Sequence, residues 1–108
     1  MRRVAWAFAG GMLLAAPSGE EAGAARVLRD AWHLATAFHP RAFAHPEHLQ
    51  RASAWIAEAF SASGARVSFQ TFMVNGVAYR NVLAQVGPMD GPRVVLGAHY
   101  DAVAISPG

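Results

Sequence analysis

The chain has 108 residues, of which 54% are hydrophobic and 15% are charged, and it has no cysteine. This length allows one small domain or part of one, and the composition is not that of a disordered protein. Without cysteine the chain forms neither a disulfide framework nor a thiolate metal site, so any metal site must use His, Asp and Glu.

The basic residues are nine arginines, and the formal net charge is only +2. These arginines are spread along the whole sequence, whereas a phosphate-binding surface gathers basic side chains on one face. We therefore expect no nucleic-acid partner.

The N-terminus has the organisation of an export signal. Two arginines follow Met1, and an apolar run from Val4 to Ala16 comes directly after them. As a helix this run would span about 20 Å, which is short of the roughly 30 Å of a bilayer core, so we expect no stable membrane anchor. The segment Ala22-Gly23-Ala24 fits the small-x-small pattern of a signal-peptidase site.

We therefore predict that residues 1–24 are a signal peptide cleaved after Ala24, and that residues 25–108 belong to the mature domain. The protein would then be secreted or periplasmic. The alternative interpretation is an Ala-rich N-terminal helix or a misassigned start codon.

The first predicted helix covers Arg26–Phe38. Apolar residues recur there at helical spacing, while a second face carries polar side chains that include His33. His39-Pro40 ends this helix, because the residue before a proline is disfavoured in the α region.

The second predicted helix begins at Pro46 and ends before Gly64. Proline suits a first helical turn, where its missing N–H needs no partner, and glycine suits the left-handed position after a helix. Glu47 and Arg51 are spaced to form an ion pair on its surface. The apolar stripe of this helix consists of Leu49, Ala52, Ile56 and Phe60.

A β-hairpin is predicted to follow. Residues from Val67 to Met73 alternate in the period-two pattern of a strand, and Val77–Val86 supplies the return strand. Asn75-Gly76 lies between them and favours the positive φ angles of a tight hairpin turn.

A more buried strand is predicted over Arg93–Ala98, where a continuous apolar run is typical of strands covered on both faces of an α/β sheet. The order of elements predicts an α/β fold. His99-Tyr100-Asp101 follows this strand, at the carboxyl end where open α/β sheets usually bind ligands. Because alternate strand residues share a side, His99 and Asp101 can face the same crevice.

The residues around this strand end resemble a known family. Leu96-Gly97-Ala98-His99-Tyr100-Asp101-Ala102-Val103, preceded by Asn81-Val82-Leu83-Ala84, is similar to the co-catalytic di-zinc aminopeptidases. This metallopeptidase family includes secreted bacterial leucine aminopeptidases, aminopeptidase Y and the glutamate carboxypeptidase relatives. The likeness continues upstream through the helix start at Pro46–Ala52 and covers roughly Leu28 to Gly108.

The resemblance implies a three-layer α/β/α zinc-exopeptidase fold with a mixed sheet. It also implies an exported aminopeptidase that hydrolyses peptide substrates with a water activated by two zinc ions. By this resemblance His99 is a ligand of one zinc, and Asp101 is the catalytic-site carboxylate that orients the metal site.

The same resemblance places the other zinc ligands and the general base after Gly108. The chain would then be the N-terminal part of a larger enzyme and inactive by itself. In the family's sheet, a strand encoded downstream separates the hairpin from the strand that carries His99.

Two other functions stay open. A related zinc carboxypeptidase or deacylase also has a His-x-Asp strand end, and a receptor- or adhesion-type member of the fold would have lost its metal ligands. The sequence indicates no particular oligomeric state. The other histidines are interpreted as surface or capping residues, because isolated histidines are usually not ligands. They are His33, His39, His45 and His48.

Overall fold

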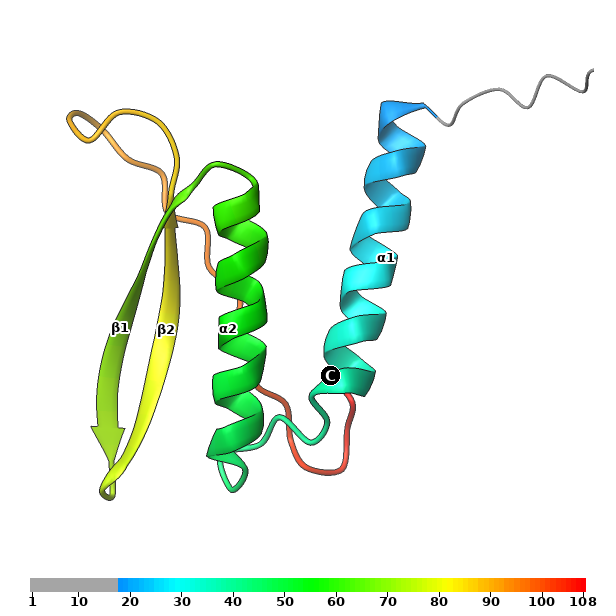
Figure 1. Ribbon diagram of the computed structural model, residues 1–108, viewed down its shortest axis with the longest axis vertical. Coiled ribbons are helices and arrows are strands. Elements are labelled where there is room, and N and C mark those ends of the chain that lie inside the picture. The colour runs from blue at the N-terminus through cyan, green and yellow to red at the C-terminus, as the bar shows by residue number, and fades with distance from the viewer. Residues whose placement is uncertain (1–17) are drawn as a thin grey trace, which may run out of the picture.

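The computed structural model describes residues 18–108, which form two helices followed by two strands (Figure 1). Helix α1 spans Gly19–Ala37 and α2 spans Pro46–Ala62, while β1 spans Arg66–Val74 and β2 spans Val77–Gln85. The fold is therefore mixed α/β, as expected. Most of the predicted signal peptide, residues 1–17, lies outside the described residues. Within 18–108, no helix is long and apolar enough to cross a membrane.

The two strands form the predicted hairpin. They pair antiparallel along their whole length, from Arg66 opposite Gln85 to Val74 opposite Val77. The turn residues Asn75 and Gly76 have φ angles of 49° and 80°, which a tight hairpin turn requires at both central positions. Figure 1 shows the hairpin against one side of α2 and α1 standing on the other side.

Helix α2 begins and ends where the sequence predicts. Pro46 lies in its first turn, and Gly64 follows the C-cap with φ 85°. Leu49 and Ala52 of the predicted apolar stripe are buried, whereas Phe60 near the C-terminal end is 41% exposed. The N-terminal half of the stripe therefore supplies the packing surface.

The expected Glu47–Arg51 ion pair is absent from the described residues. The carboxylate of Glu47 lies instead beside the imidazoles of His45 and His48, and the Arg51 guanidinium lies over the Phe38 ring, 5.6 Å from its centroid. The loss of the expected pair costs little, because an exposed ion pair contributes little in water.

Helix α1 begins earlier than predicted, at Gly19 instead of Arg26. Ser18 and Glu21 form a capping box, in which the Ser18 hydroxyl accepts from the Glu21 N–H at 3.2 Å and the Glu21 carboxylate accepts from the Ser18 N–H at 2.9 Å. The predicted cleavage segment Ala22–Ala24 therefore lies inside α1.

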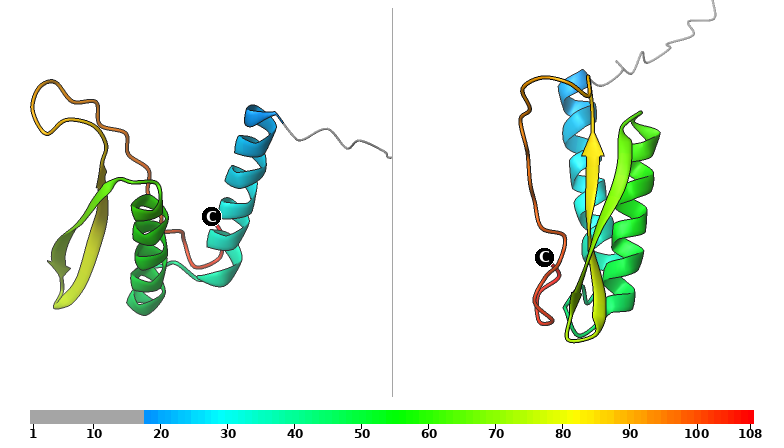
Figure 2. Two further views of the ribbon diagram at one scale, coloured as in Figure 1. Left: turned by 45° about the horizontal axis from the view of Figure 1, so that its top comes forward. Right: turned by 90° about the vertical axis from the view of Figure 1, so that its left-hand side faces the viewer.

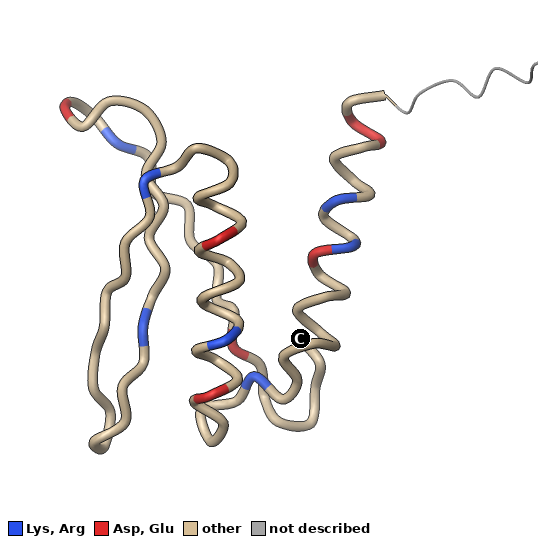
Figure 3. The backbone as a smooth tube through the Cα atoms, in the orientation of Figure 1, with Lys and Arg blue, Asp and Glu red and all other residues tan. Residues whose placement is uncertain are grey.

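His33 is not on an exposed polar face, contrary to the expectation from periodicity. Its ring is half-buried and packs edge-on against Phe38, at a centroid distance of 5.2 Å, and against Trp55 of α2 at 4.9 Å. These contacts join the C-terminal end of α1 to α2. Charged positions are spread over both helices, the hairpin and the loops, and they do not gather on one element (Figure 3).

The predicted buried strand at Arg93–Ala98 does not form. Residues 92–103 have no regular structure, and Val94, Val95 and Leu96 are 89%, 88% and 93% exposed. Figure 2 shows this part of the chain, in orange, running apart from the hairpin. A strand exists only where a neighbour pairs with its backbone groups, and no described segment forms a ladder with it.

Candidate functional site

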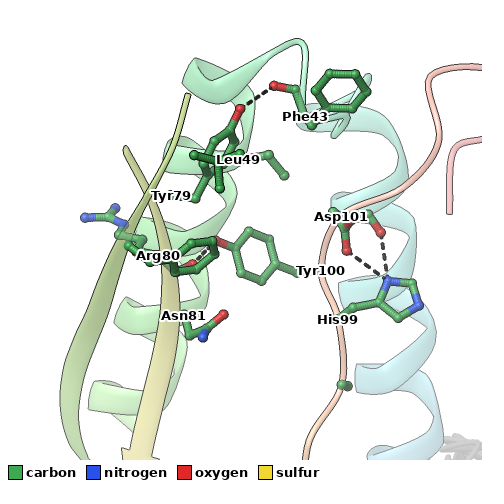
Figure 4. Close-up of a pocket in the computed structure, with 11 residues that line it drawn as sticks. Phe43, Leu49, Tyr79, Arg80, Asn81, His99, Tyr100 and Asp101 are labelled. Atoms are coloured by element: carbon green, nitrogen blue, oxygen red, sulfur yellow. Dashed lines mark hydrogen bonds and ion pairs between the residues drawn. The ribbon is translucent and has the colours of Figure 1, made fainter. Parts of the chain in front are cut away.

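Tyr100 attaches the His99-Tyr100-Asp101 segment to the hairpin. Its side chain points toward β2, and its hydroxyl donates a hydrogen bond to the carbonyl oxygen of Arg80 (Figure 4). Burial raises the pKa of Tyr100, because loss of solvent penalises the phenolate. Tyr100 therefore stays a hydroxyl donor at neutral pH.

Arg41, in the loop before α2, holds the same segment from the other side. Its Nε donates to the carbonyl oxygen of Tyr100 at 2.8 Å, and a terminal nitrogen donates to the carbonyl oxygen of Leu34 in α1. Its own carbonyl oxygen accepts from the N–H of Ala102 at 2.9 Å. Burial lowers the pKa of Arg41, and the negative charge of Asp101 counteracts part of that effect. Arg41 thus joins α1, the loop and the segment.

His99 and Asp101 lie on the side of the segment opposite Tyr100, as the alternation of the sequence predicts (Figure 4). Nδ1 of His99 is 2.9 Å from the carbonyl oxygen of Asp101 and 3.2 Å from its carboxylate. Both partners are acceptors, so in the neutral ring the proton belongs on Nδ1 and the lone pair on Nε2. A histidine held in this tautomer is ready to bind a metal through Nε2.

A pocket of about 380 Å³ lies between this segment, α2 and the hairpin. The Tyr79 hydroxyl closes one side of it by donating to the carbonyl oxygen of Phe43 at 2.8 Å (Figure 4). The pocket is bounded by an irregular segment and not by a strand end. Tyr100, rather than His99 or Asp101, points across it toward the hairpin, so the predicted strand-end crevice faced by His99 and Asp101 does not form. The residues that line it are Phe43, Leu49, Phe72, Val74, Tyr79, Arg80, Asn81, Ala98, His99, Tyr100 and Asp101.

His99 and Asp101 fit one ligand position of a zinc site, with His99 as the ligand and Asp101 beside its ring. A catalytic zinc needs about three protein ligands, and the side chain of His99, 86% exposed, offers one lone pair with its ring orientation fixed by Asp101. No third ligating side chain of residues 18–108 forms a cluster with this pair. At this position the described residues therefore offer one candidate ligand, His99, with the Asp101 carboxylate beside it.

A second group of ligating side chains lies at the start of α2, which we call the α2 cluster: His45, Glu47 and His48. Each offers one ligand atom, and these atoms lie within 4.8 Å of one another. The two imidazoles stack with centroids 5.4 Å apart. The cluster was not predicted from the sequence, because both histidines were interpreted as surface or capping residues. The available signal was their i, i+3 spacing at a helix start, which puts them on one face.

The pKa of the Glu47 carboxyl lies below its usual value. Hydrogen bonding with the backbone at Glu47 itself is the largest effect that lowers the pKa of this carboxyl, and His45 and His48 add to it. His45 is the N-cap residue of α2, yet its side chain makes no capping hydrogen bond. Its ring nitrogens are therefore not used to stabilise the helix.

Comparison with known proteins finds a partial relative. Over 72 residues, which are 67% of this chain, the sequence is 40% identical to the Escherichia coli (strain K12) protein called "Uncharacterized protein YfbL". The chain matches 22% of that protein, so it spans about a fifth of the length of this curated relative. No protein family model matches the chain, and no solved structure matches it.

Proposed function

We propose that this chain is part of an exported zinc-dependent exopeptidase, an aminopeptidase with a three-layer α/β/α fold, that hydrolyses peptides. The observation that carries the proposal is the His99–Asp101 pair. It presents one unprotonated imidazole nitrogen to solvent, beside a pocket, with its tautomer held by a neighbouring carboxylate.

The residues of the chain would have separate tasks in this reaction. Zinc, when bound, supplies polarisation of the scissile carbonyl and activation of a water molecule near neutral pH. His99 would contribute the Nε2 lone pair, and Asp101 would hold the ring orientation. Tyr100 and Arg41 would keep this segment in place through their hydrogen bonds to Arg80, Leu34 and the segment itself.

A further observation supports the proposal. Val94, Val95 and Leu96 are almost fully exposed, although an apolar run of this kind is normally covered. In the proposed fold, a further strand would lie between this segment and the hairpin.

We expect the full-length protein to hydrolyse an aminoacyl p-nitroanilide, to lose that activity to a zinc chelator and to regain it with added zinc. The matched control is the N-acetylated form of the same substrate, which should resist cleavage because an aminopeptidase requires a free amine. Cleavage of N-acyl amino acids alone would identify a carboxypeptidase or deacylase instead. A zinc-loaded protein that cleaves neither substrate would identify a non-catalytic receptor- or adhesion-type member.

Export to the periplasm or the medium is part of the proposal. Cleavage after Ala24 would remove Ser18 and Glu21 together with their capping box, so the mature helix would begin close to Arg26. We expect N-terminal sequencing of the mature protein to start at Ala25. The substitution Ala24→Arg should block processing, because the peptidase accepts only a small residue there. An intact Met1 on a cytosolic product would contradict export.

A further inference from the structure

We propose that His45, Glu47 and His48 form a second zinc-binding site, at the first turn of α2 and separate from His99. The α2 cluster provides two imidazoles and one carboxylate, a ligand set that zinc uses with a water in the fourth position. The site shares no residue with the proposed catalytic centre, so a test of this site does not depend on whether the proposed function is correct.

The backbone holds the two histidines in place before any metal binds. The N–H of His45 donates to the carbonyl oxygen of Ala42 at 2.8 Å, which closes the turn before the helix. The carbonyl oxygen of His45 accepts from the N–H groups of His48 at 3.0 Å and of Leu49 at 3.3 Å. Pro46 between them has a fixed φ. The backbones of His45 and His48 therefore belong to one hydrogen-bonded turn, which fixes the positions from which both side chains project.

The loop before α2 determines the tautomer of the neutral His48 ring. Its Nδ1 lies 3.0 Å from the carbonyl oxygen of Pro40, which is only an acceptor, so Nδ1 carries the proton. The lone pair is then on Nε2, which lies 3.7 Å from the carboxylate oxygen of Glu47. An imidazole whose second nitrogen donates to a backbone carbonyl is the usual arrangement of a metal-binding histidine.

The ligand atoms of the α2 cluster lie within 4.8 Å of one another, and the two stacked imidazoles must rotate so that both lone pairs point at one zinc ion. Zinc bonds of about 2.0–2.1 Å in a tetrahedron place neighbouring ligand atoms roughly 3.3 Å apart. The oxygen of Glu47 lies 3.4 Å from Nδ1 of His45 and 3.7 Å from Nε2 of His48. The side chains of His45 and Glu47 are 42% and 62% exposed, so an ion can enter from solvent.

Two electrostatic effects act on this site in opposite directions. The N-terminus of α2 carries the positive end of the helix dipole, which disfavours a cation. The ionised Glu47 carboxylate at the same end favours it. Two nitrogen ligands select zinc over magnesium or calcium, which prefer sets made of oxygen alone. Three converging ligands should bind zinc more tightly than one or two free histidines.

We would titrate the 108-residue chain with zinc sulfate by isothermal calorimetry at pH 7.5. One site with a dissociation constant in the low micromolar range is expected. His48→Asn is the most informative variant, because its side-chain amide can still donate to Pro40 while the Nε2 ligand is removed. We expect His48→Asn and His45→Ala each to weaken binding at least about tenfold, with Glu47→Gln showing a smaller loss.

The controls are His39→Ala and His99→Ala, which should keep the wild-type affinity. Far-UV circular dichroism of each variant checks that α2 remains helical. As a second readout, cobalt(II) should give the intense visible absorption of a tetrahedral complex in the wild-type chain and not in His48→Asn. Zinc binding that is absent from the wild-type chain, that His99→Ala abolishes, or that His48→Asn and His45→Ala both retain would overturn the proposal.

Discussion

Replacing His99 with alanine is expected to remove or loosen one zinc in the full-length protein and to lower aminopeptidase turnover by orders of magnitude. Asp101→Ala should keep the ligand set complete and lose about 10–100-fold in metal affinity or activity. In the proposed site His99 would supply the metal-binding nitrogen, whereas Asp101 would hold the ring through its contacts with Nδ1. Metal content by elemental analysis and turnover of an aminoacyl reporter measure both effects.

Two controls sharpen this comparison. Asp101→Asn keeps an oxygen that can accept from the His99 ring, so it should retain more activity than Asp101→Ala. His39→Ala, at an exposed histidine, should leave metal content and turnover unchanged. If Asp101→Ala emptied the site while His99→Ala kept both zinc ions, the roles assigned to these two residues would be reversed.

Arg41→Ala is expected to lower the free energy of unfolding of the full-length protein by about 2–4 kcal/mol. The substitution removes two hydrogen bonds from a charged donor and leaves the carbonyl oxygens of Tyr100 and Leu34 without that partner. It should also lower turnover, because the segment that carries His99 loses one of its attachments. Urea denaturation and reporter turnover, measured on the same preparation, are the tests.

Arg41→Lys is the matched variant for this effect. It keeps the charge, but a single ammonium replaces the planar fork that reaches two carbonyl groups, so its loss should be intermediate. Arg51→Ala serves as the control, because Arg51 only covers the Phe38 ring and should cost about 1 kcal/mol or less. An Arg41→Ala protein no less stable than Arg51→Ala would contradict this assignment.

The elements that local chemistry determines could be predicted from the sequence. Asn75-Gly76 sets the hairpin turn, and Pro46 and Gly64 set the ends of α2, because each acts through its own backbone angles. The segment Arg93–Ala98 could not be placed in this way. Whether it becomes a strand depends on a neighbour that pairs with it, and periodicity contains no information about that neighbour.

The candidate sites also combine features that depend on local sequence, which could be predicted, with features that depend on distant contacts, which could not. The shared side of His99 and Asp101 follows from alternation along an extended chain, so it was predictable. The role of Arg41 was not, because the carbonyl that it binds belongs to Tyr100, 59 residues further along the chain. The α2 cluster needed knowledge of the Pro40 carbonyl and the rotamers at a helix start, which residue types alone do not specify.

Ser53 on α2 acts as a spacer between the helix and the sheet. It has no exposed surface, and its hydroxyl accepts from Nε of Arg80 at 2.6 Å. Arg80 also lies over the Phe69 ring, and its carbonyl oxygen holds the hydroxyl of Tyr100. A bulkier side chain at Ser53 would push the hairpin outward and carry that carbonyl with it. Because Tyr100 directly follows His99, a change of packing between α2 and the sheet would shift His99, which Ser53 does not contact.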